Sequence, residues 1–149
     1  MANSDSRVRI LLAEDDPAIQ KVALAMLQRL GYEADAVNNG LEVLQALERH
    51  MYVLVLMDIV MPVMDGIAAT KEIRRRFPAS ELPKIVAFTA YVHTDVKKKC
   101  LEAGMDGYIV KPVKKEELEA ILMKYLGRPV LLSSRSREYA QCAFDSILI

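Results

Sequence analysis

Apolar and polar residues follow two different periods along the chain, and these periods predict strands and helices in alternation. Short apolar runs predict five strands, at residues 8–13, 32–37, 51–57, 84–89 and 107–110. Between these runs, apolar residues recur every three or four positions, as on one face of an amphipathic helix. This spacing predicts five helices, within residues 16–31, 41–47, 67–77, 94–104 and 114–126.

Strands that alternate with helices favour a parallel sheet covered on both faces and joined by right-handed crossovers. The run at 51–57 contains no charged residue, which is typical of a buried central strand. We therefore predict an α/β fold. The expected form is a doubly wound, five-stranded parallel sheet of the (βα)5 flavodoxin-like type, for which the strand order is 2-1-3-4-5.

The alternating pattern ends at the sequence Gly127-Arg128-Pro129. We expect one domain over residues 1–127, followed by a C-terminal tail over residues 128–149 that can form a short amphipathic helix. A segment of that length cannot bury a core of its own. No separate effector domain is therefore expected within this chain.

Several helix ends carry recognisable signals. Asp16 precedes a proline and is expected to cap the first helix, and Gly31 is expected to stop it. The sequence Asn38-Asn39-Gly40 predicts a turn. Thr94 or Asp95 is expected to cap the fourth helix.

Acidic residues follow two of the predicted strands directly. Asp58 ends the most apolar run, where an uncompensated carboxylate is costly, and Glu14 and Asp15 follow the first strand. The carboxyl ends of these strands are neighbours in the predicted sheet order. Clustered carboxylates favour a divalent cation, and Mg²⁺ prefers such oxygen ligands. A solvated loop is the alternative for Glu14 and Asp15.

Two further polar residues end strands at the same predicted edge. Thr89 closes the fourth strand, and Lys111 closes the fifth. A hydroxyl and an ammonium group there would complete an anion site, since lysine binds phosphate as a point charge. The combination of acids, threonine and lysine at successive strand ends carries more information than any one of them.

Composition excludes several classes of protein. The 149 residues include 20 basic and 20 acidic side chains, which argues against direct nucleic-acid binding. The longest apolar run is too short for a membrane span, and the first residues lack the apolar core of a signal peptide. Cys100 and Cys142 show no metal-ligand spacing and fit a reducing compartment. We expect a cytoplasmic protein, with the basic stretches 74–76 and 97–99 on solvated helix faces.

Four stretches together resemble the receiver domain of two-component response regulators, the CheY-like family, over about residues 7–126. They read ILLAEDDP at 10–17, LMDIVMPVMDG at 56–66, VAFTA at 86–90 and GYIVKP at 107–112. The resemblance implies that Asp58 accepts a phosphoryl group from a phosphohistidine. Its implied Mg²⁺ ligands are Glu14, Asp15, Asp58 and the backbone carbonyl of Val60.

The same resemblance implies how the phosphoryl group would be read. Thr89 and Lys111 would bind it, and movement of Thr89 would let Tyr108 turn inward and change the surface of the fourth helix, fifth strand and fifth helix. The bond between Lys111 and Pro112 is expected to be cis, an isomer accessible before proline. Asp16, one place beyond the acidic pair, keeps its capping role.

The implied protein is a phosphoacceptor that assists its own phosphorylation and slow autodephosphorylation, not an enzyme with an external substrate. Val60 and Tyr91 flank the expected path of water and suggest the slow hydrolysis, although both could simply pack. Expected partners are a sensor histidine kinase or phosphotransfer protein, a downstream protein target, and a second copy in a homodimer.

Three alternatives stay open. The chain could be a receiver fragment of a hybrid kinase or larger regulator. It could also be a vestigial interaction module that is not phosphorylated. Finally, it could be a Mg²⁺-dependent hydrolase with an aspartate nucleophile, although no second aspartate lies two residues after Asp58 to act as acid and base.

Overall fold

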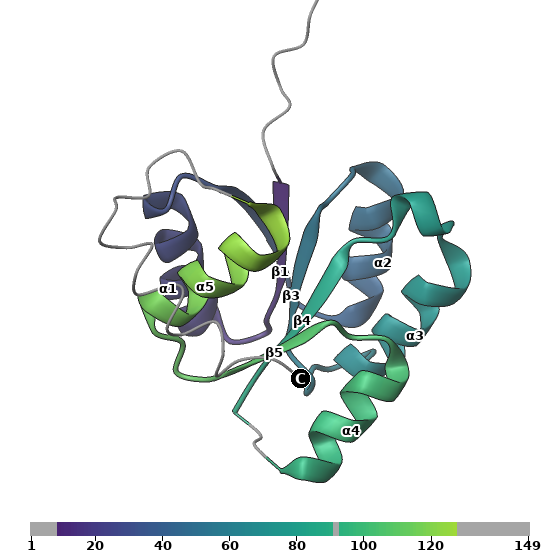
Figure 1. Cartoon of the computed structure of the whole chain (residues 1–149). Helices are drawn as coiled ribbons and strands as arrows, with labels where there is room; N and C mark the ends of the chain where they lie inside the picture. Colours follow the sequence, from purple (N-terminus) through teal and green to yellow (C-terminus); the bar gives the residue numbers. More distant parts are fainter. Residues whose placement is uncertain (1–8, 91–92, 128–149) are drawn as a thin grey trace, which may run out of the picture.

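A five-stranded parallel sheet forms the middle of the molecule (Figure 1). The computed structural model describes residues 9–90 and 93–127. The strands are β1 (Arg9–Ala13), β2 (Glu33–Val37), β3 (Leu54–Met57), β4 (Lys84–Thr89) and β5 (Gly107–Val110). The helices are α1 (Pro17–Arg29), α2 (Gly40–Arg49), α3 (Gly66–Arg76), α4 (Thr94–Ala103) and α5 (Lys115–Leu126), with a 3-10 turn at Ala79–Glu81. The strand order is β2-β1-β3-β4-β5, so the predicted fold class and order are confirmed.

The sheet separates two apolar cores. Helices α1 and α5 cover one face, and α2, α3 and α4 cover the other (Figure 1). Along β1, Ile10 and Leu12 belong to the first core and Leu11 and Ala13 to the second, because successive strand residues point to opposite faces. Burial on both faces explains why the central strand β3 is apolar throughout, whereas the edge strand β2 carries Glu33 and Asp35. Within the described ranges, no helix combines the length and hydrophobicity of a membrane span.

The third strand is shorter than its apolar run predicts. Residues 51–57 were expected to pair, but β3 begins at Leu54, and Met51 is 76% exposed. Pairing with β1 and with β4 both begin at Leu54, where the two neighbours run alongside. Met51 lies before the paired part of the strand and its side chain faces solvent, whereas Tyr52 is buried in the core although it does not pair in the sheet.

The first helix begins and ends as predicted. The Asp16 side chain accepts hydrogen bonds from the backbone N–H groups of Ala18 (2.9 Å) and Ile19 (3.4 Å). Gly31, just beyond the helix, has a φ of 89°, which favours glycine. Both features follow from local rules that do not depend on the rest of the fold.

Two other helix starts differ from expectation. The Asn39 side chain accepts a hydrogen bond from the backbone N–H of Glu42 (2.9 Å), so the predicted turn is the start of α2. The expected capping by Thr94 or Asp95 is wrong. Helix α4 begins at Thr94 itself, after His93, and has no side-chain cap.

Arg74 is not the solvated residue that the basic stretch 74–76 predicted. Its guanidinium donates to the carbonyl oxygens of Gly104 (3.0 Å) and Pro83 (2.9 Å) and to a carboxylate oxygen of Asp106 (2.9 Å). These acceptors precede β4 and β5, so Arg74 ties α3 to the amino ends of both strands. The other arginines of the stretch pair with acids on the surface.

The first and last described elements meet the amino edge of the sheet. Strand β1 starts there at Arg9, and α5 runs back to that edge, ending at Leu126 (Figure 1). The Tyr125 hydroxyl donates to the carbonyl oxygen of Asp106, the residue before β5 (2.7 Å). The expected domain end at residue 127 is compatible with the end of α5. The tail at 128–149 lies outside the described residues.

The loop after β3 folds back tightly onto the start of α3. The Gly66 backbone N–H donates to the carbonyl oxygen of Ile59 (2.9 Å), and the Asp65 side chain caps α3 by accepting from the N–H of Ala68 (2.7 Å). A Cβ atom on Gly66 would lie 2.1 Å from the carbonyl oxygen of Asp58. Only glycine lets the helix start this close to Asp58.

This close approach predicts a large difference between two glycine substitutions. Gly66→Ala should lower the free energy of unfolding by about 1 to 3 kcal/mol, because the new methyl group meets backbone atoms that cannot move aside. Gly107→Ala is the control, since its methyl group would first meet the Tyr125 hydroxyl, at 3.1 Å, the end of a side chain. Urea unfolding followed by circular dichroism measures both. Equal free energies of unfolding for the two variants would contradict the close approach of Gly66 to Asp58.

Candidate functional site

Polar side chains gather at the carboxyl edge of the sheet, as the sequence predicts. Glu14 and Asp15 follow β1, and Asp58 follows the adjacent strand β3. Carboxylate oxygens of these three residues lie within 4.8 Å of one another. A cluster of three acids therefore forms at the junction of two central strands.

Two members of this cluster are buried. Glu14 is 1% exposed and Asp58 is 6% exposed, whereas Asp15 faces solvent. Burial raises the pKa of Glu14 above its usual range, the hydrogen bond from Lys111 opposes this rise, and the nearby Asp58 carboxylate adds to it. Buried carboxylates this close together require a cation for compensation.

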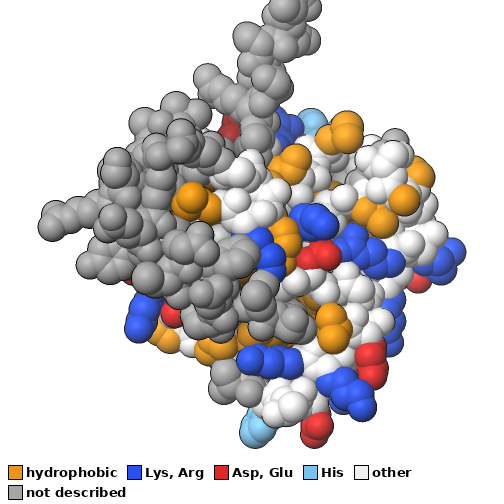
Figure 2. Space-filling model, in the orientation of Figure 1, with side chains coloured by type: hydrophobic (Ala, Val, Ile, Leu, Met, Phe, Trp, Pro, Cys, Tyr) orange, Lys and Arg blue, Asp and Glu red, His pale blue; other side chains and the backbone are white. Residues whose placement is uncertain are grey.

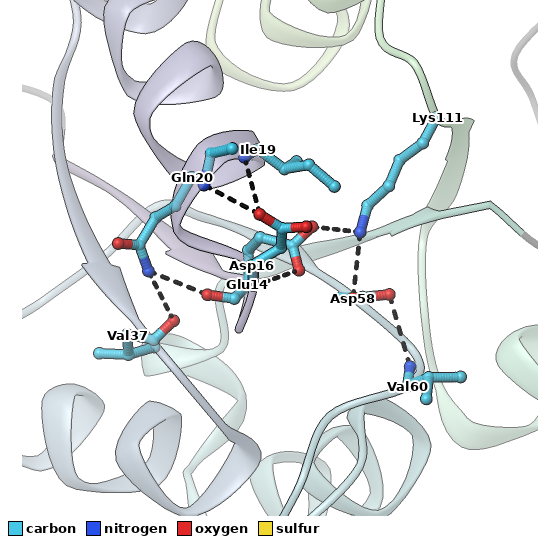
Figure 3. A network of polar contacts seen from close by, with 9 residues as sticks. Glu14, Asp16, Ile19, Gln20, Val37, Asp58, Val60 and Lys111 are labelled. Carbon is cyan, nitrogen blue, oxygen red and sulfur yellow. Dashed lines mark hydrogen bonds and ion pairs between the residues drawn. The ribbon is translucent and has the colours of Figure 1, made fainter.

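Lys111 supplies one cation to the cluster. Its ammonium nitrogen lies 3.0 Å from a carboxylate oxygen of Asp58 and forms a second ion pair with Glu14 (Figure 3). The same nitrogen lies 5.1 Å from the ring centroid of Phe88. The lysine enters from the end of β5 and reaches the ends of β3 and β1. The predicted cis bond between Lys111 and Pro112 is confirmed.

The other carboxylate oxygen of Asp58 is held more loosely. It accepts from the backbone N–H of Val60 at 3.4 Å, beyond the usual range for a strong hydrogen bond (Figure 3). The Asp58 backbone N–H donates to the carbonyl oxygen of Ala13 (3.0 Å), which ties the acid to β1. Asp58 therefore has a fixed backbone, and one of its carboxylate oxygens is held by a long hydrogen bond.

Thr89 and Tyr108 lie on the two strands beyond β3. Thr89 is fully buried at the end of β4, and its carbonyl oxygen accepts from the backbone N–H of Lys111 (2.8 Å). Tyr108 on β5 is 3% exposed, and its hydroxyl has no hydrogen-bond partner among the described residues. The ring therefore already occupies an inward position. The roles expected for both residues stay predictions, and Tyr91 lies outside the described residues.

Two residues of the site were not singled out in the sequence. The Lys111 ammonium lies over the ring of Phe88. The Gln20 side chain donates to the carbonyl oxygens of Glu14 (2.9 Å) and Val37 (3.4 Å) (Figure 3). Gln20 thereby holds the backbone of the acidic loop. Neither residue type has a spacing signal, because both contacts arise only when β1, β2 and β5 reach the same edge.

The residues fit a magnesium site. Three carboxylates in one cluster provide the hard oxygen ligands that Mg²⁺ takes, and Mg²⁺ commonly binds through one or two carboxylates with water and phosphate oxygens. Lys111 adds a positive charge that can pair with a bound anion. The arrangement can hold a cation and a phosphoryl group side by side next to the loosely held oxygen of Asp58.

Surface charge is mixed elsewhere on the molecule. On the face that Figure 2 displays, Lys and Arg side chains lie among Asp and Glu side chains and do not form one continuous basic patch. Arg75 and Arg76 both pair with Glu72. The acidic cluster with Lys111 differs from these surface pairs, because it gathers charges of both signs, two of them on buried carboxylates, at one edge of the sheet.

The family model that matches the chain is the response regulator receiver domain, over residues 10–123. Histidine protein kinase 1 of Candida albicans is 46% identical over 114 residues, and histidine kinase 1 of Arabidopsis thaliana is 38% identical over 139 residues. Each match covers 70% of this chain. The chain spans only 5% and 12% of the lengths of these two relatives.

Solved structures give the same result. The receiver domain of a sensor histidine kinase from Pseudomonas aeruginosa, which has magnesium coordinated in its active site cleft, is 40% identical, with a TM-score of 0.74. That match covers 82% of this chain and 99% of the other. The receiver domain of the Saccharomyces cerevisiae response regulator Ssk1, in complex with the histidine phosphotransfer protein Ypd1, is 26% identical, with a TM-score of 0.73 and coverages of 80% and 88%. The sequence motifs, the fold, the acidic cluster and these matches agree, and the chain belongs to the response regulator receiver domain family.

Proposed function

We propose that Asp58 accepts a phosphoryl group from the phosphohistidine of a histidine kinase or phosphotransfer protein, and that this is the input to the chain. The observation that carries the proposal is the Lys111 ammonium, which bridges Asp58 and Glu14 beside the acidic cluster. A lysine in this position can stay paired with the negative charge of the phosphoryl oxygens while the group moves from the donor to Asp58. The loosely held oxygen of Asp58 is the proposed attacking atom.

The transfer itself replaces one bond to phosphorus with another. The Asp58 carboxylate oxygen forms a bond to phosphorus, the bond from phosphorus to the histidine nitrogen breaks, and its electron pair stays on the imidazole, which takes up a proton. Lys111 and Thr89 would bind the phosphoryl oxygens. Catalysis of this kind is mostly positioning and electrostatic stabilisation.

The acidic cluster would hold Mg²⁺ during this step. The proposed ligands are the carboxylates of Glu14, Asp15 and Asp58 and the backbone carbonyl of Val60, with Glu14 acting largely through water. When bound, the ion would offset negative charge on the transferring group. The support for this site is the clustering of the three acids and the magnesium in the related Pseudomonas domain.

A groove beside the site suits an upstream partner. Apolar side chains from the first turns of α1 and from the end of β5 line it next to Lys111, among them Ile19, Val22, Pro112 and Val113. Val22 is 54% exposed. An apolar helix face of a partner would fit such a groove. A histidine phosphotransfer protein is one candidate, because the related yeast receiver domain was solved in complex with one.

The proposed output is a change at the surface of α4, β5 and α5, through Thr89 and Tyr108. A downstream protein target, or a second copy in a homodimer, would bind this surface. We place the chain in the cytoplasm, as a phosphoacceptor and not an enzyme with an external substrate. Because the relatives are long histidine kinases, the chain also fits a receiver segment of a larger regulator.

Phosphorylation by a small donor tests the central claim. Incubation with Mg²⁺ and a small acyl phosphate should add one phosphoryl group per chain, seen by mass spectrometry of the intact protein. Asp58→Asn should abolish the addition, because the amide cannot attack. Asp65→Asn is the matched control, since it removes an acid from the same loop but keeps a side-chain cap for α3.

The same experiment separates the alternatives. Absence of any adduct on the wild-type chain would favour the vestigial interaction module and contradict the proposal. Rapid multiple turnover of phosphate esters would favour the hydrolase. A stable adduct that persists in Asp58→Asn would place the acceptor on another residue.

Binding of Mg²⁺ should stabilise the fold. At a concentration about a hundredfold above Kd, the free energy of unfolding should rise by about 2.7 kcal/mol. Asp15→Asn should lose most of this gain, because it removes a proposed ligand. Asp16→Asn removes the same charge one residue away and keeps the cap on α1, so it should retain the gain. Equal responses of the two variants in thermal unfolding would rule out Asp15 as a ligand.

The lifetime of the phosphorylated state depends on the residue at 60. Val60 is 53% exposed beside Asp58, and its apolar side chain cannot orient an attacking water. We expect a half-life of minutes or longer, shortened severalfold by Val60→Asn. Val63→Asn is the control, because Val63 lies in the same loop but is not among the described hydrogen-bond partners of Asp58. Loss of the phosphoryl group within seconds in the wild-type chain would refute slow hydrolysis.

A further inference from the structure

The buried position of the Tyr108 ring carries an energetic penalty. The side chain is 3% exposed and packs in the core that also holds Cys100 of α4 and Met105. Its hydroxyl is enclosed without a hydrogen-bond partner among the described residues. An enclosed hydroxyl that loses its water partners opposes burial. Other contacts of the ring must therefore hold it inside.

Lys97 provides such a contact. Its ammonium nitrogen lies 5.3 Å from the centroid of the Tyr108 ring, in the geometry of a cation–π interaction. Lys97 lies in the first turn of α4, next to β5 (Figure 1). None of the ion pairs found among residues 9–90 and 93–127 involves Lys97. Among the described residues, the Lys97 ammonium therefore contacts the Tyr108 ring and forms no ion pair.

We propose that Lys97 is a positioning residue for the Tyr108 switch, and that its positive charge holds the ring in the buried position. Without that charge, the penalty on the enclosed hydroxyl favours the outward position. A residue of α4, away from the acidic cluster, then determines the equilibrium between the buried and outward positions of the Tyr108 ring. The link from this balance to Asp58 rests on the proposed function.

The neighbouring lysines do not share this contact. Lys98 and Lys99 are exposed on the same helix, and the cation–π contacts of the described residues pair only Lys97 with Tyr108. Successive residues of a helix point in directions about a quarter-turn apart. The stretch 97–99 therefore offers one lysine that acts on the switch and two matched controls.

Packing by the lysine stem is the competing explanation. Lysine can cover an apolar surface with its methylene groups while the charge stays in water. Lys97→Met keeps a flexible apolar stem of similar length and removes the charge, whereas Lys97→Arg keeps a cation. If the stem alone matters, methionine will hold the ring as well as lysine does.

The signal linking the switch to Asp58 must be reciprocal. Suppose that a phosphoryl analogue at Asp58 binds more tightly when the Tyr108 ring is buried. A charge that favours the buried ring must then also raise the affinity for the analogue, because the coupling between two equilibria is reciprocal. An exposed cation–π contact corresponds to about a two- to fivefold change in such an equilibrium. Loss of the Lys97 charge should therefore weaken phosphoryl-analogue binding by no more than that factor.

The first experiment needs no phosphoryl group. The full chain is labelled with carbon-13 on its tyrosine rings, and the Tyr108 resonances are identified by their loss in Tyr108→Phe. Lys97→Met should shift these resonances toward a solvent-exposed environment and raise the outward fraction about two- to fivefold. Lys97→Arg and Lys98→Met should leave them unchanged. Resonances in Lys97→Met that match those of Lys98→Met would overturn the proposal.

The second experiment measures the coupling. Beryllium trifluoride with Mg²⁺ serves as the phosphoryl analogue, and its apparent affinity is compared in the wild type, Lys97→Met and Lys98→Met. We expect about two- to fivefold weaker binding only in Lys97→Met. Equal affinities, despite a shifted ring, would overturn the link to Asp58.

The two proposals fail in different ways. If the wild-type chain binds no analogue at all, the phosphoacceptor function fails, while the ring measurement still decides the role of Lys97. If the wild type binds and the ring does not move, only the role of Lys97 fails. Lys97→Gln serves as a second uncharged variant if circular dichroism shows that Lys97→Met is misfolded.

Discussion

The ammonium group of Lys111 holds the carboxyl edge of the sheet together. It neutralises charge on two buried carboxylates, Glu14 and Asp58, that belong to different strands. In the strand order, β4 lies between β5, which carries the lysine, and β3, which carries Asp58. The long side chain therefore crosses the end of β4, over the ring of Phe88. Removing one partner from such a group leaves a buried charge uncompensated, so the site is assembled as a unit.

The two sides of this edge are built differently. The main chain of Asp58 is held by backbone contacts: its N–H donates to the carbonyl oxygen of Ala13, and α3 starts against its carbonyl oxygen at Gly66. Around Tyr108 the contacts come from side chains that can rotate, and one polar atom is left without a partner. A carboxylate with a fixed main chain on one side, and a ring with side-chain contacts on the other, would allow a local charge to bias the proposed two-state element.

Sequence patterns predicted most of the fold because its main determinants are local. Asp16 and Gly31 mark the ends of α1 through capping and backbone conformation, and the alternation of strands and helices predicts a parallel sheet covered on both faces. The order 2-1-3-4-5 belongs to the flavodoxin-like type of such sheets, and alternation alone does not fix it. The acids, Thr89 and Lys111 were found because each lies at the carboxyl end of a strand or within two residues of it.

The misses share a physical cause: they depend on tertiary contacts. Met51 is apolar but lies outside the paired part of β3, and Arg74 is basic but bound by three acceptors from distant loops. Gln20 and Phe88 support the site only because β1, β2 and β5 end at one edge. No residue type or spacing reveals contacts of this kind before the topology is known.

The position of Arg9 and Leu126 at the amino edge of the sheet has a consequence for how such a domain can be used. Both ends of the described fold lie across the sheet from Asp58, so flanking polypeptide starts on the side away from the acid cluster. A domain of this topology can be joined to other modules at the amino edge, without a connection at the edge that holds the acidic cluster. The topology makes it a portable unit, in keeping with relatives in which the matching segment is a small fraction of a long kinase.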